Sequence, residues 1–331
     1  MYTFLEYTNE QLPFDLSFPQ SELYAKIQTK QNFGVDRFVI KEQNSIIGFF
    51  QTITYPLIKS KTSIYIPYGP VLTKTDPDLI TEMTIFLQKL GVQKNAVFIR
   101  TDFSTQEQIS LPKTYREIPG YAYKTAYHQP RGEWLLDITP TVDELLGAMH
   151  KKTRYNIKKS LKQDLETSFF SGKDLVPWAD TFIALNQQNT SSHKTTTHSK
   201  SYFKSFFEFA GESSENFIAI TRKEGHVLAI NLFIVNNGLA FCPFGASNDL
   251  GKKLGAYYHI KWSSIQHMKD MGTTLFNWGG VSVGMHDDYL LGVTKFKTGF
   301  GGASFTHPPL RDIIIKPFWY NLYMFRKFLR K

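Results

Sequence analysis

The stretch Phe217-Ile218-Ala219-Ile220-Thr221 decides the fold, because it is the first strand in a series of predicted elements that occurs twice in the chain. A Lys223-Glu224-Gly225 turn joins this apolar run to a second one at 226–235. Two such runs around a short turn that contains glycine predict a β-hairpin. The residues that follow predict a third strand at 238–245, a helix at 253–271 and a last strand at 274–278.

The same order occurs nearer the N-terminus. Its segments are a hairpin of Arg37-Phe38-Val39-Ile40-Lys41 and 46–54 around Gln43-Asn44-Ser45, a strand at 63–71, a helix at 77–90 and a strand at 96–100. Hairpins and helices also recur by chance in mixed proteins, but here the turn residues and strand lengths match in order, which favours a duplication. Hairpin, strand, helix and strand is the core order of N-acetyltransferase-like (GNAT-like) folds, in which substrates meet where the central strands splay. We therefore expect an α/β (α+β) protein of two GNAT-like domains, formed by 1–132 with 309–331 and by 133–308.

Composition places the chain among globular proteins of a reducing compartment. Of its 331 residues, 42% are hydrophobic and 20% are charged, which supplies a buried core and argues against disorder. The single cysteine, Cys242, allows neither an internal disulfide nor a cysteine-based metal site. Residues 1–19 lack the pattern of a secretory signal, and no apolar run approaches the roughly 20 residues that span a bilayer. We expect a cytoplasmic protein.

The net charge of +9, with a pI of about 9.3, favours an anionic partner. Nucleic acid, phosphorylated small molecules and an anionic membrane surface all fit, and composition does not choose among them. The sequence contains no nucleophile elbow, zinc-binding helix or phosphate-binding loop motif. His286-Asp287-Asp288 is interpreted as an exposed turn, so no metal is expected.

The region between the two copies predicts helices at 141–163 and 177–188. Thr141 or Thr139 can cap the first of them. The polar segment 190–201 is interpreted as a loop. It is either a loop that becomes ordered when a ligand binds or an idle surface loop.

Two motifs carry the functional signal. The first is the run Met149-His150-Lys151-Lys152-Thr153-Arg154-Tyr155-Asn156-Ile157-Lys158-Lys159-Ser160. It places Lys151, Arg154, Lys158 and Lys162 on one helix face, which is either a solvated face or a phosphate-binding one. The second is Phe296-Lys297-Thr298-Gly299-Phe300-Gly301-Gly302, which ends a segment that holds seven glycines between 279 and 302. Glycines at this density allow a ligand to approach the backbone closely.

Together these motifs resemble the FemABX family of aminoacyltransferases, which take an amino acid from aminoacyl-tRNA and add it to the peptide stem of a peptidoglycan precursor. The resemblance covers nearly the whole chain, is strongest from 149 to 302 and is weaker before 120. The sequence has no heptads and no long charged helical insertion, so it resembles the compact members that lack a coiled-coil arm. Because the activated ester belongs to the tRNA, the resemblance implies that no cofactor is needed.

The resemblance assigns roles on the donor side. Lys297 matches a lysine near the acyl group and the tRNA end, where it can stabilise the tetrahedral oxyanion. Phe296 beside it is expected to contact substrate. Asp102, at a predicted strand end, matches an acidic position proposed as the proton acceptor, although a carboxylate there is also often a cap or turn residue. The cationic face then binds tRNA phosphates without reading bases.

The resemblance also implies residues that bind the acceptor. Lys26, in Tyr24-Ala25-Lys26, matches a lysine that contacts the diphosphate of the precursor, and Tyr202 matches a tyrosine whose hydroxyl meets the precursor. Two positions depart from the family. Lys200 stands in place of an arginine and lacks its bidentate geometry. Phe244 stands at a tyrosine position and cannot donate a hydrogen bond.

The C-terminal segment 316–331 combines aromatic and basic residues. It predicts either a helix at an anionic membrane surface or a closing helix that packs on the first domain. We expect a monomer that uses a soluble nucleotide precursor or its lipid-linked successor, and the sequence does not identify the amino acid transferred. Two other functions stay open: an acyl-CoA transferase with its pyrophosphate site at 249–256, and a non-catalytic RNA-binding or membrane-associated protein.

Overall fold

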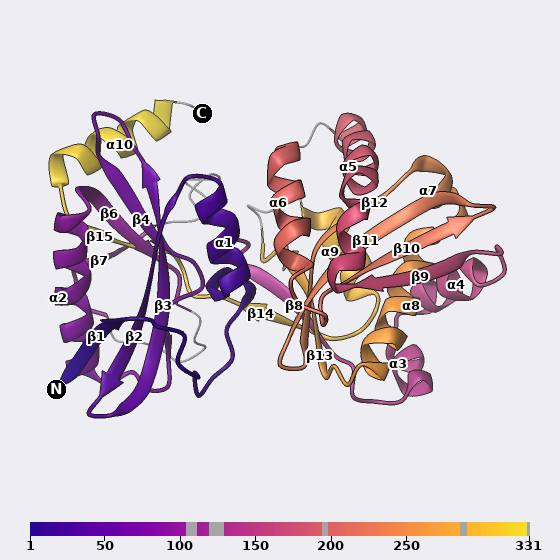
Figure 1. Cartoon of the computed structure of the whole chain (residues 1–331), viewed down its shortest axis with the longest axis horizontal. Coiled ribbons are helices and arrows are strands. Elements are labelled where there is room, and N and C mark those ends of the chain that lie inside the picture. Colours follow the sequence, from indigo (N-terminus) through magenta and orange to yellow (C-terminus); the bar gives the residue numbers. More distant parts are fainter. Residues whose placement is uncertain (104–110, 119–128, 194–197, 285–289, 330–331) are drawn as a thin grey trace. The chain divides into compact units, whose positions relative to one another are not determined.

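The computed structural model describes residues 1–103, 111–118, 129–193, 198–284 and 290–329, and the chain forms two compact units. Unit 1 contains the described residues of Met1–Arg131, Val283–His286 and Thr306–Lys331, and unit 2 contains those of Gly132–Ser282 and Asp287–Phe305. Each unit has its own β-sheet with helices packed on it (Figure 1). The expected domain boundaries at 132 and 308 stay a prediction. The turn His286-Asp287-Asp288 lies outside the described residues.

Unit 1 is built on an eight-stranded sheet. Its strands lie in the order β1-β2-β3-β4-β6-β15-β7, and β5 pairs with β3. The pairing of β4 with β6 is parallel. The elements are β1 (Tyr2–Glu6), η1 (Phe18–Gln20), α1 (Glu22–Lys30), β2 (Gly34–Glu42), β3 (Ser45–Pro56), β4 (Thr62–Ile66), β5 (Val71–Leu72), α2 (Pro77–Gln93), β6 (Ala96–Thr101), β7 (Tyr115–Glu117), β15 (Arg311–Ile314) and α10 (Pro317–Leu329).

Helix α2 covers one face of this sheet because its apolar residues recur at helical spacing. Leu79, Met83 and Leu87 are fully buried and share one core cluster with Phe50 of β3. Burying each such side chain contributes about 2 kcal/mol. Figure 1 shows α1 across the sheet from α2. The sheet of unit 1 is therefore covered on both faces.

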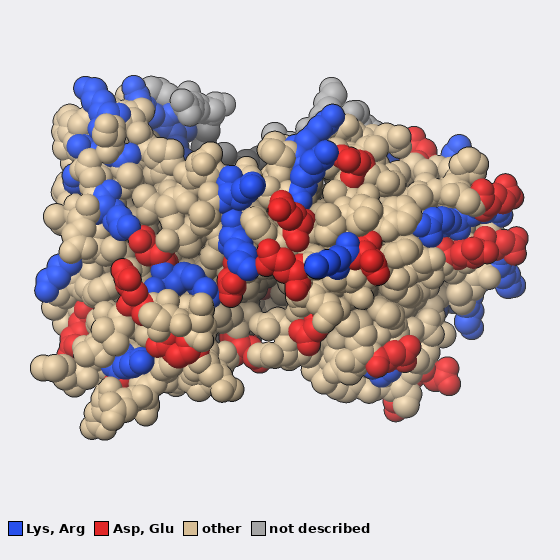
Figure 2. Space-filling view, viewed as in Figure 1, with Lys and Arg blue, Asp and Glu red and all other residues tan. Residues whose placement is uncertain are grey.

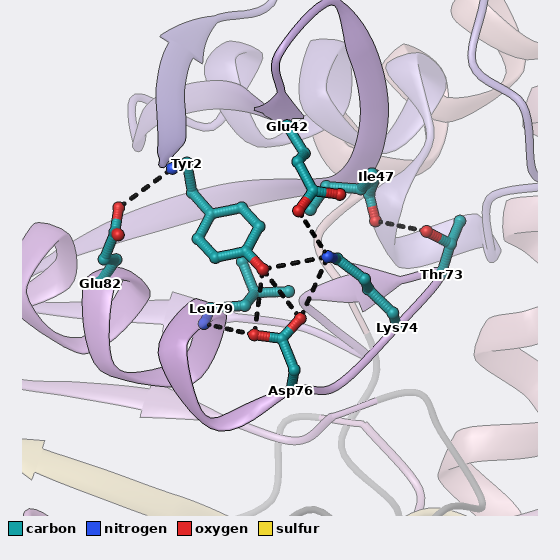
Figure 3. A network of polar contacts seen from close by, with 8 residues as sticks. All are labelled: Tyr2, Glu42, Ile47, Thr73, Lys74, Asp76, Leu79 and Glu82. Atoms are coloured by element: carbon teal, nitrogen blue, oxygen red, sulfur yellow. Dashed lines mark hydrogen bonds and ion pairs between the residues drawn. The ribbon is translucent and has the colours of Figure 1, made fainter.

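A polar network ties the N-terminal strand to the start of α2 (Figure 3). Asp76 caps the helix by accepting a hydrogen bond from the Leu79 N–H at 2.9 Å, and the Tyr2 hydroxyl donates to the same carboxylate at 2.9 Å. Lys74 Nζ donates to the Tyr2 hydroxyl at 3.0 Å and to Glu42 at 2.7 Å. The hydrogen bonds from Leu79, Tyr2 and Lys74 lower the pKa of Asp76 to about 2. Because an ordinary aspartate titrates near pH 4, this cap stabilises the fold above about pH 4 and is lost as the pH falls toward 2.

The predicted order of the first copy is confirmed by β2, β3, β4, α2 and β6. The expected strand at 63–71 is shorter, because β4 ends at Ile66 and β5 begins only at Val71. Between them, Tyr68 has a φ of 47°. A residue at positive φ is not in the extended conformation of a strand, and so the expected strand is divided here.

Unit 2 contains a seven-stranded sheet in the order β14-β8-β13-β12-β11-β10-β9. The pairing of β12 with β13 is parallel. The elements are β8 (Gly132–Asp137), α3 (Val142–Ala148), α4 (Lys151–Ser160), β9 (Glu166–Ser171), η3 (Gly172–Trp178), α5 (Ala179–His193), α6 (Lys200–Ala210), β10 (Phe217–Lys223), β11 (His226–Asn236), β12 (Leu239–Ser247), α7 (Asp249–Leu254), α8 (Ala256–Asp270), β13 (Leu275–Val281), α9 (Leu291–Thr298) and β14 (Ala303–Thr306).

Helix α8 packs on one face of the second sheet. Its residues Ile260, Ile265 and Met268 are buried in one cluster with Phe217 of β10 and Phe276 of β13. Helices α5 and α6 lie on the side of the sheet away from α8 (Figure 1). Helices α3 and α4 share the cluster of α8 through their own buried residues.

The expected helix at 141–163 is wrong as a single element, because it is divided into α3 and α4. The N-terminal cap is confirmed: Thr141 and Glu144 form a capping box. At the break, Met149 is extended with a ψ of 154°, and the His150 N–H donates to the carbonyl of Gly299 at 2.9 Å. This bond to a distant segment replaces the helical one, and so the local pattern did not reveal the break.

Three further segments differ from expectation. The helix expected at 253–271 is divided into α7 and α8 by Gly255, whose φ is 75°. The helix expected at 177–188 begins as the 3₁₀ turn η3 and continues as α5 to His193. The polar segment expected as a loop is partly helical, since α5 reaches into it and Ser199 caps α6 by accepting a hydrogen bond from the Tyr202 N–H. Residues 194–197 lie outside the described residues.

Each unit thus contains a hairpin, a third strand, a helical segment and a strand parallel to the third. In unit 1 these are β2, β3, β4, α2 and β6; in unit 2 they are β10, β11, β12, α7 with α8, and β13. The parallel pair occupies the corresponding place in both. The predicted fold class of two GNAT-like α/β units is confirmed.

Candidate active site

A cavity of roughly 600 Å³ opens in unit 2 where the two central strands diverge. Strands β12 and β13 pair only from Leu239 with Leu275 to Phe241 with Asn277. The residues that follow on each strand, Cys242 on β12 and Trp278 on β13, line the cavity. The other lining residues are Pro243, Gly245, Lys252, Tyr257, Lys261, Gly292, Val293, Phe296 and Lys297.

The divergence has a local cause on both strands. On β12, Pro243 has no N–H to donate, and the register with β11 shifts between Leu232 and Ile234. On β13, Gly279 has a φ of 74°, and the register with β8 shifts between Asn277 and Gly280. At these interruptions the two strands stop pairing, and the backbone segments that follow line the cavity.

Lys297 reaches into this cavity from α9. Its Nζ donates to the carbonyl of Gly280 at 2.6 Å. Burial, and next the repulsion from Lys261, lower the pKa of Lys297 to about 8. At pH 7 about nine-tenths of these side chains remain ammonium ions. Such a weakly solvated cation is suited to stabilise an oxyanion that forms beside it.

Phe296 holds the other side of α9 in the core. Its ring lies 5.2 Å from that of Tyr257, 5.1 Å from that of Tyr258 and 5.2 Å from that of Phe300. These edge-on contacts fix the helix turn that carries Lys297. Phe296 also lines the cavity, and its expected contact with substrate stays a prediction.

The two functional motifs of the sequence lie side by side in unit 2. The hydrogen bond from His150 to Gly299 joins the start of α4 to the end of α9. A β-carbon at Gly299 would collide with the Thr153 side chain, and one at Gly302 would collide with the carbonyl of Leu135. The glycines therefore permit close packing of this turn on α4 and β8, and no ligand is needed to explain them.

The cations of the first motif do not form one uniform face. Lys151 and Lys158 are exposed on α4, and Lys162 is exposed beyond the end of the helix. Arg154 is partly buried, and its Nη1 donates to the carbonyls of Gly147, at 3.0 Å, and Met149. Arg154 thus closes the end of α3 and has a structural role that the sequence did not reveal.

Basic and acidic side chains are interspersed on the face that Figure 2 shows. Although the net charge is +9, the basic side chains therefore do not form a single basic surface on that face. The segment from Lys151 to Lys162 departs from this mixture, because it holds six cationic residues and no acidic one. Local clusters of this kind are what can attract a polyanion.

Three residues predicted to bind the acceptor meet around α6. The Tyr202 ring is buried and stacks on His198 at 4.0 Å, and it lies 6.3 Å from the Phe244 ring on β12. Lys200 is exposed in the first turn of α6. Phe244 follows Cys242 by two residues on β12, and so this aromatic cluster continues from a strand that lines the cavity.

The other two predicted residues belong to unit 1. Asp102 directly follows β6, is only 3% exposed, and accepts hydrogen bonds from the Tyr65 hydroxyl at 2.7 Å and the Tyr68 N–H at 2.6 Å. Burial raises the pKa of Asp102 to about 8. Lys26 lies on α1 and pairs with Glu22 at 3.1 Å.

Sequence reasoning missed the polar residues that α8 contributes to the cavity. Lys261 of α8 is only 4% exposed, and its Nζ donates to Cys242 Sγ at 2.9 Å. Tyr257 lies one helical turn earlier and also lines the cavity. A signal was present, because Lys261 falls between Ile260 and Trp262 on the buried stripe of a helix, where a lysine is uncommon.

The described residues contain no group of three or more histidine, cysteine or acidic side chains arranged to hold a metal ion. None of the helices within these residues is long and apolar enough to span a bilayer.

The FemAB family matches residues 3–116, 113–222 and 210–327. The chain belongs to the FemAB family. A UDP-N-acetylmuramoylpentapeptide-lysine N(6)-alanyltransferase from Weissella viridescens is 24% identical over 267 residues, which cover 77% of each chain. The resemblance expected from the two motifs is confirmed.

Solved structures agree with the fold. The crystal structure of FemX matches with a TM-score of 0.80 at 14% identity, over 93% of this chain and 94% of that one. A tandem GNAT protein from the clavulanic acid biosynthesis pathway matches with a TM-score of 0.53 at 8% identity, over 86% and 83% of the two chains. Both likenesses agree with a fold of two GNAT-like units.

Proposed function

We propose that this FemAB protein transfers an amino acid from aminoacyl-tRNA to the stem peptide of a peptidoglycan precursor, and so helps to build the interpeptide bridge. The observation that carries the proposal is Lys297, a partly desolvated cation in the cavity where β12 and β13 diverge. Family membership and the alanyltransferase from Weissella viridescens support the same reaction. We also propose that the protein acts as a monomer.

The chemistry is acyl transfer from an ester to an amine. The neutral amine of the acceptor attacks the ester carbonyl, a carbon–nitrogen bond forms, and the carbonyl oxygen becomes an oxyanion. Collapse of this intermediate breaks the carbon–oxygen bond to the ribose. The ribose oxygen receives a proton, and the amine nitrogen releases one. The protein must therefore hold both substrates, stabilise the oxyanion and accept a proton.

The residues divide among these tasks. Lys297 stabilises the oxyanion, and Phe296 positions the group beside it. Asp102 accepts the proton, since a carboxyl whose pKa is raised to about 8 is a stronger base than an ordinary one. Lys26, Lys200, Tyr202 and Phe244 bind the precursor, with phosphate groups at the two lysines.

The exposed cations of α4 and the residues after it bind the tRNA. Lys151, Lys158 and Lys162 contribute sequence-independent contacts to phosphates. Arg154 contributes the guanidinium nitrogens that Gly147 and Met149 do not occupy. Docking along this segment places the acceptor stem next to the turn that follows Lys297, because α4 is bonded to that turn.

An acyl-CoA transferase is less consistent with the structure. The candidate pyrophosphate site begins α7, where the Gly251 N–H already donates to the Asn248 side chain at 2.8 Å. A β-carbon at Gly251 would lie 2.6 Å from the carbonyl of Leu228, so packing explains this glycine. We expect millimolar coenzyme A to leave the melting temperature unchanged, whereas a CoA enzyme would be stabilised by mass action.

The location we propose is cytoplasmic, with peripheral contact to the inner face of the membrane through α10. Two large aromatic side chains of this helix, Phe318 at 73% and Phe325 at 59%, are exposed. Arg326 and Lys327 follow Phe325 directly. Exposed aromatics beside cations suit an anionic headgroup region.

The test of the function is a product mass. The purified protein is incubated with a mixed pool of charged tRNAs and UDP-MurNAc-pentapeptide, and the precursor is weighed. We expect the mass of one aminoacyl group, which also identifies the amino acid. The same assay with the lipid-linked precursor distinguishes the acceptors. An unchanged mass with both precursors would contradict the proposal and favour a non-catalytic binder. A product in the absence of charged tRNA would contradict the aminoacyl-tRNA donor.

A further inference from the structure

The cavity of unit 2 brings the single cysteine of the chain among basic side chains. Cys242, Lys252, Lys261 and Lys297 all line it. The lining residues include no aspartate or glutamate. The cavity is therefore an electropositive pocket that holds one nucleophilic sulfur atom.

Lys261 lacks an ordinary counter-charge. Within the part of the chain that the structure describes, Cys242 Sγ is the only atom that accepts a hydrogen bond from its Nζ, and no carboxylate pairs with it. Four aromatic rings surround this ammonium, from Phe233 at 5.1 Å to Tyr257 at 5.9 Å. Their faces compensate part of the desolvation, but a buried cation is expected to have an anionic partner.

The sulfur of Cys242 occupies the place of this partner. Its Sγ accepts the hydrogen bond from Lys261 at 2.9 Å and lies farther, at 3.5 Å, from the carbonyl oxygen of Phe244. Cysteines beside a lysine are those that react with electrophiles and disulfides, because the thiolate is the nucleophile. Cys242 is also a partly exposed residue, and it lines the cavity through which reagents can reach it.

We propose that Cys242 is a thiol-modification site for anionic low-molecular-weight disulfides, and that the adduct closes the cavity of Lys297. The Cys242 thiolate attacks one sulfur of the disulfide, a new sulfur–sulfur bond forms, and the old one breaks. The departing thiolate takes a proton from solvent. The Cys242 sulfur is oxidised, the released sulfur is reduced, and a thiol reductant reverses the exchange.

The adduct occupies the space into which Lys297 projects, since both side chains line one cavity. Loss of transfer activity rests on the proposed function, whereas formation of the adduct does not depend on it.

Intact-mass analysis with oxidised glutathione tests the site directly. The chain has one cysteine, so we expect one glutathione adduct per protein, removed by dithiothreitol, and none in Cys242→Ser. Cystamine, a cationic disulfide, should react about tenfold more slowly than oxidised glutathione at low salt. Equal rates for the two disulfides, or no adduct, would overturn the proposal.

Two lysine variants test the role of Lys261. Lys261→Met keeps the side-chain length and should slow the reaction with oxidised glutathione about tenfold. Lys204→Met, at an exposed lysine of α6, is the matched control and should leave the rate unchanged. An unchanged rate in Lys261→Met would contradict a role of Lys261 in the reaction of Cys242. The comparison of the two disulfides in the parent protein gives an answer even if this variant is unstable.

Activity is measured last, on protein with and without the adduct. We expect transfer to fall at least about tenfold in the modified protein and to recover with dithiothreitol. Cys242→Ser, at whatever level it works, should be insensitive to oxidised glutathione. Full activity of modified protein would overturn closure of the cavity. If the unmodified protein transfers nothing, the proposed function fails, and the adduct mass still decides the modification site.

Discussion

The ammonium of Lys297 lies where burial favours the neutral amine, which is why its pKa is near 8. A surface lysine would be fully solvated, and its electrostatic interaction with an oxyanion would be weak. In the cavity the same charge has few competing water contacts, so a developing negative charge interacts with it more strongly. The cost of burying Lys297 in the resting protein is therefore linked to its use in the reaction.

Replacing Lys297 by Met should lower kcat by roughly 10²–10³-fold and change KM little, because the lost contact exists mainly in the transition state. The melting temperature should stay level or rise at pH 7, since a desolvated charge is removed. Lys295→Met, at an exposed lysine on the same helix, is the control. Unaltered turnover in Lys297→Met would remove this residue from the mechanism.

The same pKa predicts the alkaline side of the rate profile. As the pH rises through about 8, Lys297 loses its proton and kcat should fall. Lys297→Arg keeps its charge at every accessible pH, so its residual activity should not fall in this range. Measurement of kcat from pH 6 to about 9.5 in both proteins checks this, and a parallel decline in the two would assign the titration to another group.

The variant Asp102→Asn distinguishes a role of Asp102 as proton acceptor from a purely structural role. If Asp102 accepts the proton, kcat in the parent should rise as the pH approaches about 8, and the variant should lose that limb along with most of its rate. The raised pKa means that folding takes up a proton between about pH 4 and 8, so the contribution of Asp102 to stability falls as the pH rises through that window. The variant should therefore show a flatter dependence of melting temperature on pH. A lowered melting temperature with the rising limb intact would leave Asp102 only the task of holding Tyr65 and Tyr68.

At this scale the sequence could indicate Lys297 and Asp102 only through motif likeness. The pKa shifts of these two residues depend on burial by residues that are distant in the sequence. Lys261 was missed for the same reason: its partner is Cys242, 19 residues away on another element, and a single lysine in an apolar helix does not identify it.

Among the elements, α4 shows how one motif serves packing and binding together. Its buried residues Thr153 and Ile157 face the core, while Lys151 and Lys158 face solvent. Arg154 lies between these sets and bonds the last carbonyls of α3. A sequence reading of one cationic face therefore combined two roles.

The double variant Lys151→Gln/Lys158→Gln should weaken tRNA binding and lower the slope of log Kd against log salt by about one unit for each lost phosphate contact. Lys173→Gln/Lys204→Gln, which removes two exposed lysines elsewhere in unit 2, is the matched control. Arg154→Gln should instead lower stability by about 1 kcal/mol, because two carbonyls lose their donor. A salt slope in the first double variant equal to that of the parent would make this helix face an ordinary solvated one.

The order of elements was predictable because hairpins and apolar strands have local signals. Glu224 and Gly225 at positive φ mark the β10–β11 turn in sequence and structure alike. The helix breaks at Met149 and Gly255 were not predictable in this way. The first depends on a hydrogen bond to Gly299, and the second on a left-handed glycine within an otherwise helical pattern.

Across the whole molecule, the two units carry different chemistry at equivalent positions of their sheets. In unit 2 the strands that follow the parallel pairing frame the cavity of Lys297. In unit 1 the pairing of β4 with β6 ends at Ile66 and Thr101, and Asp102 follows directly. There the Tyr68 N–H and Tyr65 hydroxyl bond the carboxylate. One repeat thus presents a basic cavity and the other a buried acid.

The C-terminal helix closes unit 1 and leaves an exposed aromatic face. Tyr320 is fully buried, and its hydroxyl donates to Asp312 at 3.0 Å, which in turn pairs with Arg100 at 2.8 Å. Both readings from the sequence are therefore compatible with one helix. Its inner side packs on β6, and Phe318 and Phe325 remain exposed.

Phe318→Ser/Phe325→Ser tests the exposed side. The parent protein should sediment with vesicles to an extent that rises with their phosphatidylglycerol content and falls with salt, because cations draw α10 to the surface while the aromatics enter the headgroup region. The double variant should bind about tenfold more weakly at an unchanged melting temperature. Ile85→Ser, at an exposed residue of α2, should behave like the parent, whereas Tyr320→Ala should lower the melting temperature by opening the core. If the parent binds no vesicles, α10 is a closing helix alone, and the soluble nucleotide precursor becomes the expected acceptor.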